Sequence, residues 1–217
     1  MGTREREAGG GRRSNVERTA TTRRKVIEST IACLYAHGYT ATTTAMIAQH
    51  AKISRGALLH HFPTKVDLVL ALIEHVVAHQ RAFYIAALRA YPKGRERFVA
   101  MTELTWQAWS EPSGVAITEV MVAARSDRVL GDRLPGLFEM IEAAQLAEMR
   151  TLARLAGVMD DHAVETFSQL SAAAIRGLAI ERVFRKDGQA VASAMALLRE
   201  LKMLYTDRLL DRAVEHG

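Results

Sequence analysis

The sequence predicts an all-α protein with a small N-terminal three-helix domain and a larger helical domain behind it. Three observations predict this class. Ala, Leu, Met, Arg and Glu, which favour helices, are abundant. Apolar residues recur at spacings of three and four along most segments. Strand-like alternation is not evident, and 217 residues are enough to bury a sizeable core in two modules.

Residues 1–18 are expected to form a disordered basic tail. This stretch contains Gly9-Gly10-Gly11 between arginines and glutamates and has no apolar periodicity, which is typical of disordered segments. The positive charge that crowds this end should face phosphates. Two interpretations stay open: a solvated tail, or an arm that adds contacts to a nucleic-acid backbone or minor groove.

Residues 21–37 are expected to form the first helix. Four residues make its apolar face: Ile27, Ile31, Leu34 and Tyr35. Gly38 should end this helix, because the left-handed C′ position favours glycine. Cys33, the only cysteine, should be a buried and inert thiol, and no intramolecular disulfide can form.

Residues 42–65 are typical of a helix-turn-helix. The seam between its two short helices should consist of Ile47, Ala51, Ile53, Leu58 and Phe62. The turn Lys52-Ile53-Ser54 is short, as DNA-binding helix-turn-helix motifs require. Capping residues are expected before each helix: Thr42 and Thr43, then Ser54, then Thr64 before a helix that opens at Lys65. Pro63 should end the second helix.

Residues 65–157 predict four further helices. They are expected at 65–89, 95–110 and 115–125, with a fourth opened by Pro135 and ending near Gly157. Pro- and Gly-containing breaks separate the first three. The helix at 65–89 has broad apolar cover, so it can contact both modules and carry a shift from one to the other.

The last two helices, at about 161–185 and 189–212, are rich in Ala and Leu on more than one face. Such a pair buries too little on its own. We therefore expect it to form a four-helix bundle with a second copy of the chain. The alternative is that other helices of the same chain cover both faces.

The segment HGYTATTTAMIAQHAKISRGALLHHFPTK resembles the DNA-binding domain of TetR-family transcriptional regulators. The residues that match the family pattern are Gly38, Tyr39, Thr42, Thr43, Ile47, Ala48, Ile53, Ser54, Gly56, Leu58, His61, Phe62, Thr64 and Lys65. The predicted domain that carries the resemblance, residues 19–65, makes up between a fifth and a quarter of the chain. Leu59 departs from it, because the family commonly has a tyrosine there that touches the DNA backbone.

The second helix of the motif is predicted to read DNA. Arg55 can donate two hydrogen bonds to guanine, Gly56 allows close approach, and Ala57 can touch a thymine methyl group. His60 lies on the same outward face, and Leu59 offers apolar contact alone. The expected phosphate contacts are Thr43, Thr44, His61 and Lys65. Two copies would read a palindromic double-stranded DNA.

The same resemblance implies a small-molecule effector that binds among the central helices and tilts the helix at 65–89, so that DNA is released. Candidate pocket residues are Glu103, Trp106, Trp109, Glu119, Met121, Arg125, Phe138, Met140 and Phe167. The alternative is that these aromatic residues are simply core. The expected domains are therefore a tail (1–18), a DNA-binding domain (19–65) and an effector-binding and dimerisation domain (66–217).

These observations predict a ligand-responsive homodimeric regulator, acting as a repressor. The alternative is a nonspecific or architectural DNA-binding protein without an effector. No phosphate loop, nucleophile elbow or zinc motif is visible, so neither an enzyme nor a cofactor is expected. His60 with His61, and His75 with His79, lack identifiable further metal ligands. No signal peptide or membrane-spanning run is recognised, so a cytoplasmic location is expected.

Overall fold

The computed structural model describes the backbone of residues 8–215 and the side chains of residues 17–212. Its elements in chain order are α1 (Ala8–Ala41), α2 (Thr44–His50), α3 (Arg55–His61), α4 (Lys65–Ala87), the 3₁₀ turn η1 (Leu88–Ala90), α5 (Arg95–Trp109), α6 (Pro112–Ala123), α7 (Arg128–Leu155), α8 (Asp161–Phe184) and α9 (Gln189–Glu215). No strand occurs in this part of the chain, and the predicted all-α class is confirmed.

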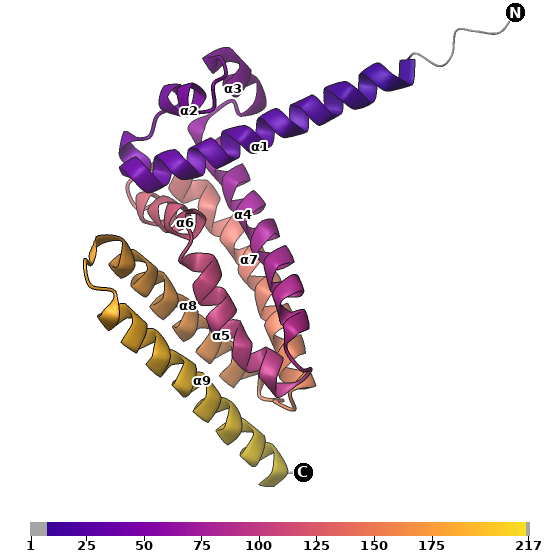
Figure 1. The fold of residues 1–217 in the computed structure, drawn as a ribbon, viewed down its shortest axis with the longest axis vertical. Helices are drawn as coiled ribbons and strands as arrows, with labels where there is room; N and C mark the ends of the chain where they lie inside the picture. Colours follow the sequence, from indigo (N-terminus) through magenta and orange to yellow (C-terminus); the bar gives the residue numbers. More distant parts are fainter. Residues whose placement is uncertain (1–7, 216–217) are drawn as a thin grey trace, which may run out of the picture.

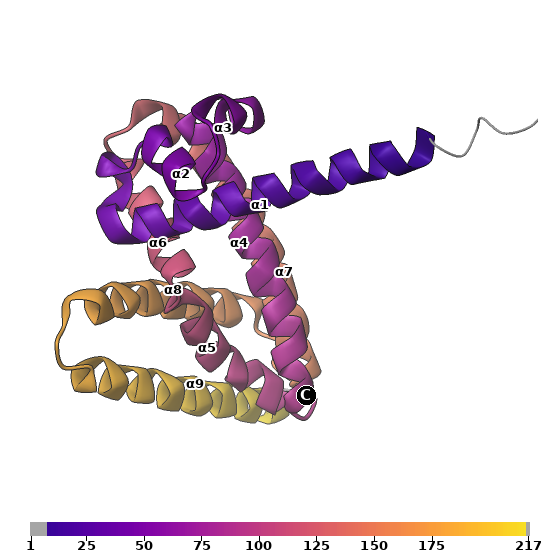
Figure 2. The same ribbon diagram turned by 45° about the horizontal axis from the view of Figure 1, so that its top comes forward.

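The helices gather at two ends of an elongated molecule (Figure 1). Helices α1, α2 and α3 lie at one end, while α5, α8 and α9 lie at the other. Helix α6 packs against α1 between them, and α4 and α7 run side by side from one end to the other (Figures 1 and 2). The N-terminal end is thus carried on two long helices rather than on a loop.

The largest buried cluster crosses the boundary between these ends. Leu34 of α1, Leu58 of α3, Leu72 of α4, Ile117 of α6 and Leu130 of α7 all belong to it and are at most 1% exposed. Full burial of such a side chain stabilises a fold by roughly 1.5–3 kcal/mol. The N-terminal domain is therefore packed firmly onto α6 and the start of α7.

Helix α1 begins much earlier than predicted. Residues 8–18, expected to be disordered, continue the helix to Ala8, which projects away from the body of the molecule (Figure 1). Residues 1–7 of the expected tail lie outside the described residues. Extending a packed helix requires no new nucleus, and this stretch contains good helix formers besides its three glycines. The predicted start of the first helix at residue 21 was therefore too late, because it depended on apolar periodicity alone.

Gly38 interrupts α1 as predicted. Its φ of 70° and ψ of 174° kink the helix, and a positive φ costs glycine little. After the kink, the buried hydroxyl of Thr42 donates to the carbonyl of Gly38 at 2.7 Å. Thr42 is therefore committed to α1, so its predicted role as a cap of α2 was wrong.

Two prolines lie at different helix positions from those predicted. Pro112, placed in a break, occupies the first turn of α6, where its missing N–H costs nothing. Pro135, predicted to open a helix, lies inside α7. That helix starts earlier because the Asp127 carboxylate caps it, accepting a hydrogen bond from the amide of Leu130 at 3.1 Å.

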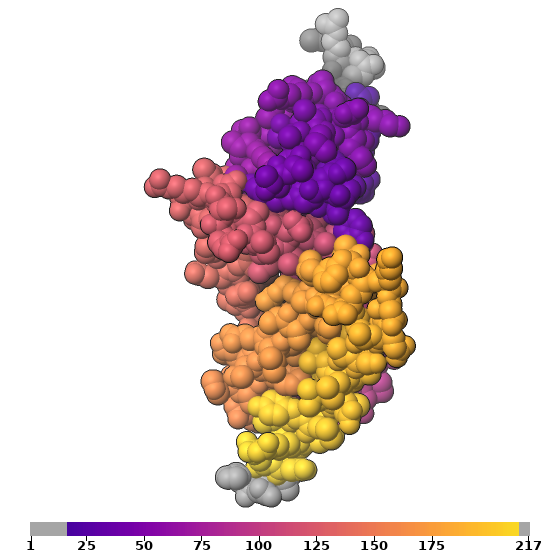
Figure 3. Space-filling model, turned by 90° about the vertical axis from the view of Figure 1, so that its left-hand side faces the viewer, coloured from indigo at the N-terminus to yellow at the C-terminus, as the bar shows by residue number. Residues whose placement is uncertain are grey.

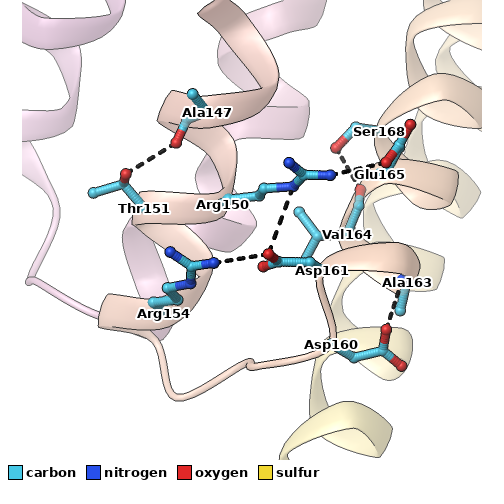
Figure 4. A network of polar contacts seen from close by, with 10 residues as sticks. All are labelled: Ala147, Arg150, Thr151, Arg154, Asp160, Asp161, Ala163, Val164, Glu165 and Ser168. Carbon is cyan, nitrogen blue, oxygen red and sulfur yellow. Dashed lines mark hydrogen bonds and ion pairs between the residues drawn. The ribbon is translucent and has the colours of Figure 1, made fainter. Parts of the chain in front are cut away.

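Charged residues fasten the end of α7 to the start of α8 (Figure 4). Arg150 donates to Glu165 at 2.9 Å, and Arg154 donates to Asp161 at 2.7 Å. Asp160 caps α8 by accepting from the amide of Ala163. The exposed pairs each contribute at most about 1 kcal/mol, so their main effect is to fix the angle of this corner.

Helices α8 and α9 form an antiparallel pair along one side of the molecule (Figures 2 and 3). Its outer face carries exposed apolar side chains, among them Leu170, Phe184, Leu197, Leu201 and Leu204. A groove of about 450 Å³ runs between the two helices, bordered by small residues of α8 and leucines of α9. The intramolecular alternative does not account for this face, because no other helix of the described chain covers it (Figure 3).

Helix α4 together with η1 is long and apolar enough to span a membrane by length and composition. The prediction that no such run exists was therefore wrong. The apolar residues Leu68, Leu72 and Ile73 are completely buried in the protein core. A helix in the centre of a protein core can be as long and as apolar as a membrane-spanning helix. This explains why α4 has the length and composition of a spanning helix.

Candidate DNA-binding surface and effector region

Capping groups define both helices of the motif. Thr43 accepts a hydrogen bond from the amide of Met46 at 3.2 Å, and Ser54 accepts one from the amide of Ala57 at 3.1 Å. Between the helices, Lys52 takes the left-handed conformation at φ 51°, which closes the tight turn. The predicted turn and the caps Thr43 and Ser54 are confirmed.

The two faces of α3 differ in burial. Leu58 and Phe62 are at most 1% exposed and pack with Ile47 and Ala51 of α2. Arg55, Gly56 and His60 are exposed on the opposite face, and Ala57 is half-buried. The seam is therefore as predicted, and the residues expected to read bases are accessible.

The residues expected to contact phosphates have different environments. Thr43 is exposed at the N-terminus of α2, and Thr44 is half-buried in its first turn. His61 is half-buried, with its ring 5.6 Å from that of His60. Leu59 packs partly against the core, which leaves it less apolar surface for a partner than the sequence implied.

Lys65 is engaged inside the protein. Its ammonium donates to the carbonyl of Tyr39 at 2.5 Å and lies 3.7 Å from the centroid of the Tyr39 ring. The Tyr39 hydroxyl in turn donates to Asp127 at 2.8 Å. In this structure the ammonium is directed toward α1, so a phosphate contact would require it to leave the Tyr39 carbonyl.

We call Tyr39, Lys65 and Asp127 the clasp, because they join α1, α4 and the start of α7. Burial raises the pKa of Tyr39, and the hydrogen bond to Asp127 adds to the effect. Burial lowers the pKa of Lys65, and the nearby Asp127 carboxylate opposes the shift. The amide of Leu130, more than Tyr39, lowers the pKa of Asp127. At neutral pH the clasp therefore contains a neutral phenol and a carboxylate.

A second link lies beside the clasp. Arg133 of α7 donates to Asp67 at 2.7 Å, and the same carboxylate forms the capping box of α4 with Thr64. The hydrogen bonds from Arg133 and Thr64 lower the pKa of Asp67. The first turn of α4, directly behind α3, is thus tied to α7.

Positive charge is concentrated at the α1–α3 end. Residues 19–65 hold six Lys and Arg and one acidic residue, whereas the whole chain has a net charge of +5. The remainder of the chain therefore has no net charge overall. The Arg23 guanidinium lies 4.4 Å from the centroid of Phe62, so α1 adds charge next to α3. This distribution attracts a polyanion to one end of the molecule.

The nine residues predicted for the effector pocket do not gather in one place. Trp106 and Trp109 pack against a small cluster around Ile175, Met195 and Leu198. Met121 and Phe138 pack against the large N-terminal cluster, which Trp109 also contacts. Two further members of the predicted set, Arg125 and Met140, are exposed, Met140 by 67%.

The remaining members lie elsewhere. Phe167 stacks on Tyr205 with a centroid separation of 5.4 Å, and Glu103 is paired with Arg199 at 2.6 Å. Glu119 of α6 lies close to the kink of α1, since a Cβ added at Gly38 would be 3.1 Å from its carboxylate. Sequence spacing identified residues of the central helices but could not show which of them face one another.

Sequence reasoning missed three polar features. The Asp127 and Arg133 links to α1 and α4 join residues far apart in the chain. Lys202, in the middle of α9, is only 4% exposed. A lysine within the apolar stripe of α9 was the one signal that could have identified it. No cluster of three metal-ligating residues occurs among the described side chains.

Residues 26–72 match the family model described as bacterial regulatory proteins, tetR family. An uncharacterized HTH-type transcriptional regulator of Mycobacterium tuberculosis is 25% identical over 131 residues, which are 60% of this chain and 67% of that protein. The HTH-type transcriptional regulator CymR of Pseudomonas putida is 41% identical over 63 residues, 29% of this chain and 31% of CymR.

Solved structures resemble almost the whole chain. A putative transcriptional regulator from Saccharomonospora viridis in complex with choline has a TM-score of 0.63 at 21% identity, covering 84% of this chain and 95% of its own. A putative TetR-family regulator from Rhodococcus has a TM-score of 0.60 at 16% identity, covering 88% and 99%. At these identities the likeness establishes the fold. The family-model match over residues 26–72, which contain α2 and α3, supports a TetR-family transcriptional regulator.

Proposed function

We propose that the chain acts as a homodimeric repressor that reads a palindromic operator with α3 of each copy and is released by a small molecule. The observation that supports this most is the two-sided burial of α3, where Arg55, Gly56 and His60 are exposed opposite Leu58 and Phe62. Residues 19–65 would bind DNA, and residues 66–217 would bind the effector and dimerise.

The exposed apolar face of α8 and α9 supports the dimer. Leu197 and Leu201 are 55% and 46% exposed beside the groove between the two helices. Alanines and Gly177 border the groove on α8, and such small residues allow a helix to approach closely. A second copy placed on this face would complete a four-helix bundle and present two α3 helices to successive major grooves.

The links between α7 and the DNA-binding end support a ligand response. A molecule that moves α5 or α7 would act on α4 through packing and on α1 and α4 through the clasp and the Arg133–Asp67 bond. To release DNA, it must bind the DNA-incompetent form more tightly than the competent form.

Two similar proteins support repression and a small-molecule effector. The HTH-type transcriptional repressor AcnR of Corynebacterium diphtheriae is 29% identical over 99 residues, which supports repression. The Saccharomonospora regulator was solved with choline, which supports a small molecule as the kind of effector.

A gel-shift titration tests this proposal. The purified chain would be titrated onto the intergenic DNA beside its own gene and onto a scrambled duplex of equal length at fixed salt. We expect operator binding at least about 1,000-fold tighter than scrambled binding, the lower bound for specific regulators. Equal affinity for both duplexes would instead support the nonspecific DNA-binding alternative.

A further inference from the structure

Three cationic residues lie where α5 packs against α9: Arg95 of α5, and Arg199 and Lys202 of α9. Two of them have acidic partners. Arg95 forms a two-bond pair with Asp207 at 2.6 and 2.8 Å, and Arg199 pairs with Glu103 at 2.6 Å. Lys202 lies between these pairs. None of the described carboxylates pairs with its ammonium, which is 3.2 Å from the centroid of Phe98 and 5.0 Å from that of Phe167.

Lys202 is nearly buried against two aromatic rings, those of Phe98 and Phe167. Its side chain is 4% exposed and Phe98 is 2% exposed. Burial alone lowers the pKa of Lys202, to about 7. An ammonium in such a place costs several kcal/mol unless it is paired, and contact with aromatic faces returns only about 2 kcal/mol of this. The position is therefore poorly explained as a stabilising core residue.

A second unpaired polar group lies at the same level. Ser171 of α8 is 8% exposed, and its hydroxyl has no hydrogen-bond partner. In the antiparallel α8–α9 pair Phe167 faces Tyr205, and Ile175 packs with Leu198. Ser171, midway between Phe167 and Ile175, is therefore at the level of Lys202. Two different helices thus supply an ammonium and a hydroxyl, both donors, to one apolar region.

We infer that Lys202 and Ser171 bind the carboxylate of an anionic effector with an apolar body. The ammonium and the hydroxyl would each donate to one carboxylate oxygen, and Phe98 and Phe167 would contact the apolar part. Phe167 and Tyr205 are stacked and only half-buried, so they form the outer edge through which such a molecule would enter. This inference rests on the proposed effector response and names its chemical class.

The effect on DNA would follow from the position of Phe98. It lies on α5, which packs against α4, α7, α8 and α9. A carboxylate that draws Lys202 away from the Phe98 ring would let α5 shift against α4, which follows α3 directly in the chain.

The test uses benzoate and octanoate as probes, with benzamide and octanamide as neutral controls of similar shape. Thermal unfolding and calorimetric titration of the full chain at millimolar probe concentrations would measure binding. We expect at least one carboxylate to raise Tm while its amide does not. Lys202→Met should weaken carboxylate binding about 10-fold or more, since a charged hydrogen bond contributes about 1.5–3 kcal/mol. Ser171→Ala should weaken it by a smaller factor.

Lys93→Met is the matched control, because Lys93 is exposed in the loop before α5, and it should bind as wild type. The inference is overturned if neither carboxylate binds, if the amides bind equally well, or if Lys202→Met keeps wild-type affinity. If Lys202→Met does not fold, the Ser171→Ala variant decides. Carboxylate binding by Ser171→Ala that is as tight as in the wild type overturns the inference.

Operator titrations separate this inference from the proposed function. Specific operator binding without any carboxylate binding would reject the anion site and leave the regulator intact. Lys202-dependent carboxylate binding that leaves operator affinity unchanged would confirm the site and reject its role as a release switch.

Discussion

Arg55 is the first residue of α3, where an exposed guanidinium can reach into a major groove. Replacing Arg55 with Ala should reduce operator affinity about 5- to 150-fold, since a bidentate contact to guanine contributes about 1–3 kcal/mol of discrimination. Binding to scrambled DNA should change much less. Gel shifts with both duplexes measure this, and Arg208→Ala, an exposed arginine of α9, controls for charge. Unchanged operator preference would show that Arg55 reads no base.

Lys202 should make stability depend on pH. Its folded-state pKa of about 7 is below its unfolded value, which is near 10.4. Between these values the unfolded chain binds more protons, so wild-type stability should rise with pH relative to Lys202→Met. Below about pH 7 the difference should be constant and favour the variant. Urea unfolding of the wild type and of Lys202→Met across this pH range measures the difference in their free energies of unfolding. A difference that does not change with pH would contradict a lowered pKa of Lys202 in the folded protein.

At this scale the sequence predicted local features well. Ser54 and Thr43 cap their helices because short polar side chains reach amides three residues ahead. Lys65 could not be predicted, because the carbonyl that it binds belongs to Tyr39 on another helix. A helix cap depends on residues that are close in the chain and can be predicted from sequence. A hydrogen bond between two helices depends on how the helices pack.

The corner between α5 and α6 depends on a close backbone approach. A Cβ added at Gly114 would lie 2.3 Å from the carbonyl oxygen of Trp109, whereas one added at Gly136 in α7 meets nothing within 4 Å. Gly114→Ala should therefore destabilise the fold by about 3 kcal/mol or more through forced backbone movement. Gly136→Ala should stabilise α7 by up to about 1 kcal/mol. Chemical unfolding of both variants measures this, and equal effects would contradict the steric account.

The clasp should hold the start of α7 on α1. Tyr39→Phe removes the hydrogen bond to Asp127 and leaves the ring under Lys65, so it should cost about 1 kcal/mol. Amide hydrogen exchange in the first turn of α7 should accelerate, as read by mass spectrometry. Tyr35→Phe is the control, since Tyr35 is 45% exposed on α1. Equal exchange in both variants would show that packing alone holds this contact.

Most helices could be predicted from the periodicity of their apolar residues. Their boundaries could be predicted only where a glycine or proline interrupts or ends the helix. Gly38 interrupts α1 with a kink, and α3 ends just before Pro63, because each residue resists helical geometry. Two starts were missed: α1 continues through a glycine run, and α7 starts at the cap Asp127 ahead of Pro135. In α1, extension of an existing helix outweighed the weak helix propensity of the glycines. In α7, the cap at Asp127 outweighed the disruption expected from Pro135.

For the molecule as a whole, the exposed face of α8 and α9 should decide the oligomeric state. Leu197→Glu places a carboxylate in the proposed interface, and its burial would cost several kcal/mol. We expect this variant to be monomeric by sedimentation velocity and to lose operator affinity. Met140→Glu, on the 67% exposed surface of α7, should stay dimeric. A dimeric Leu197→Glu protein would place the interface elsewhere.

The overall division into a DNA-binding end and a helical body could be predicted, because the helix-turn-helix signal is local. The arrangement inside the body could not. The nine candidate pocket residues are divided between separate clusters and the surface, since each belongs to a helix whose rotation depends on its neighbours. Lys202 became notable only once Phe98 and Phe167 were seen around it.

The burial of Cys33 has a practical consequence. It is the chain's only cysteine, is 4% exposed, and has a thiol pKa that burial raises, so it should resist nitroxide reagents at neutral pH. An introduced Gln49→Cys on the exposed side of α2 would then accept a single paramagnetic label per chain. If two copies assemble as proposed, pulsed dipolar spectroscopy would give the distance between their two labels, in free solution and after addition of operator DNA or a carboxylate probe.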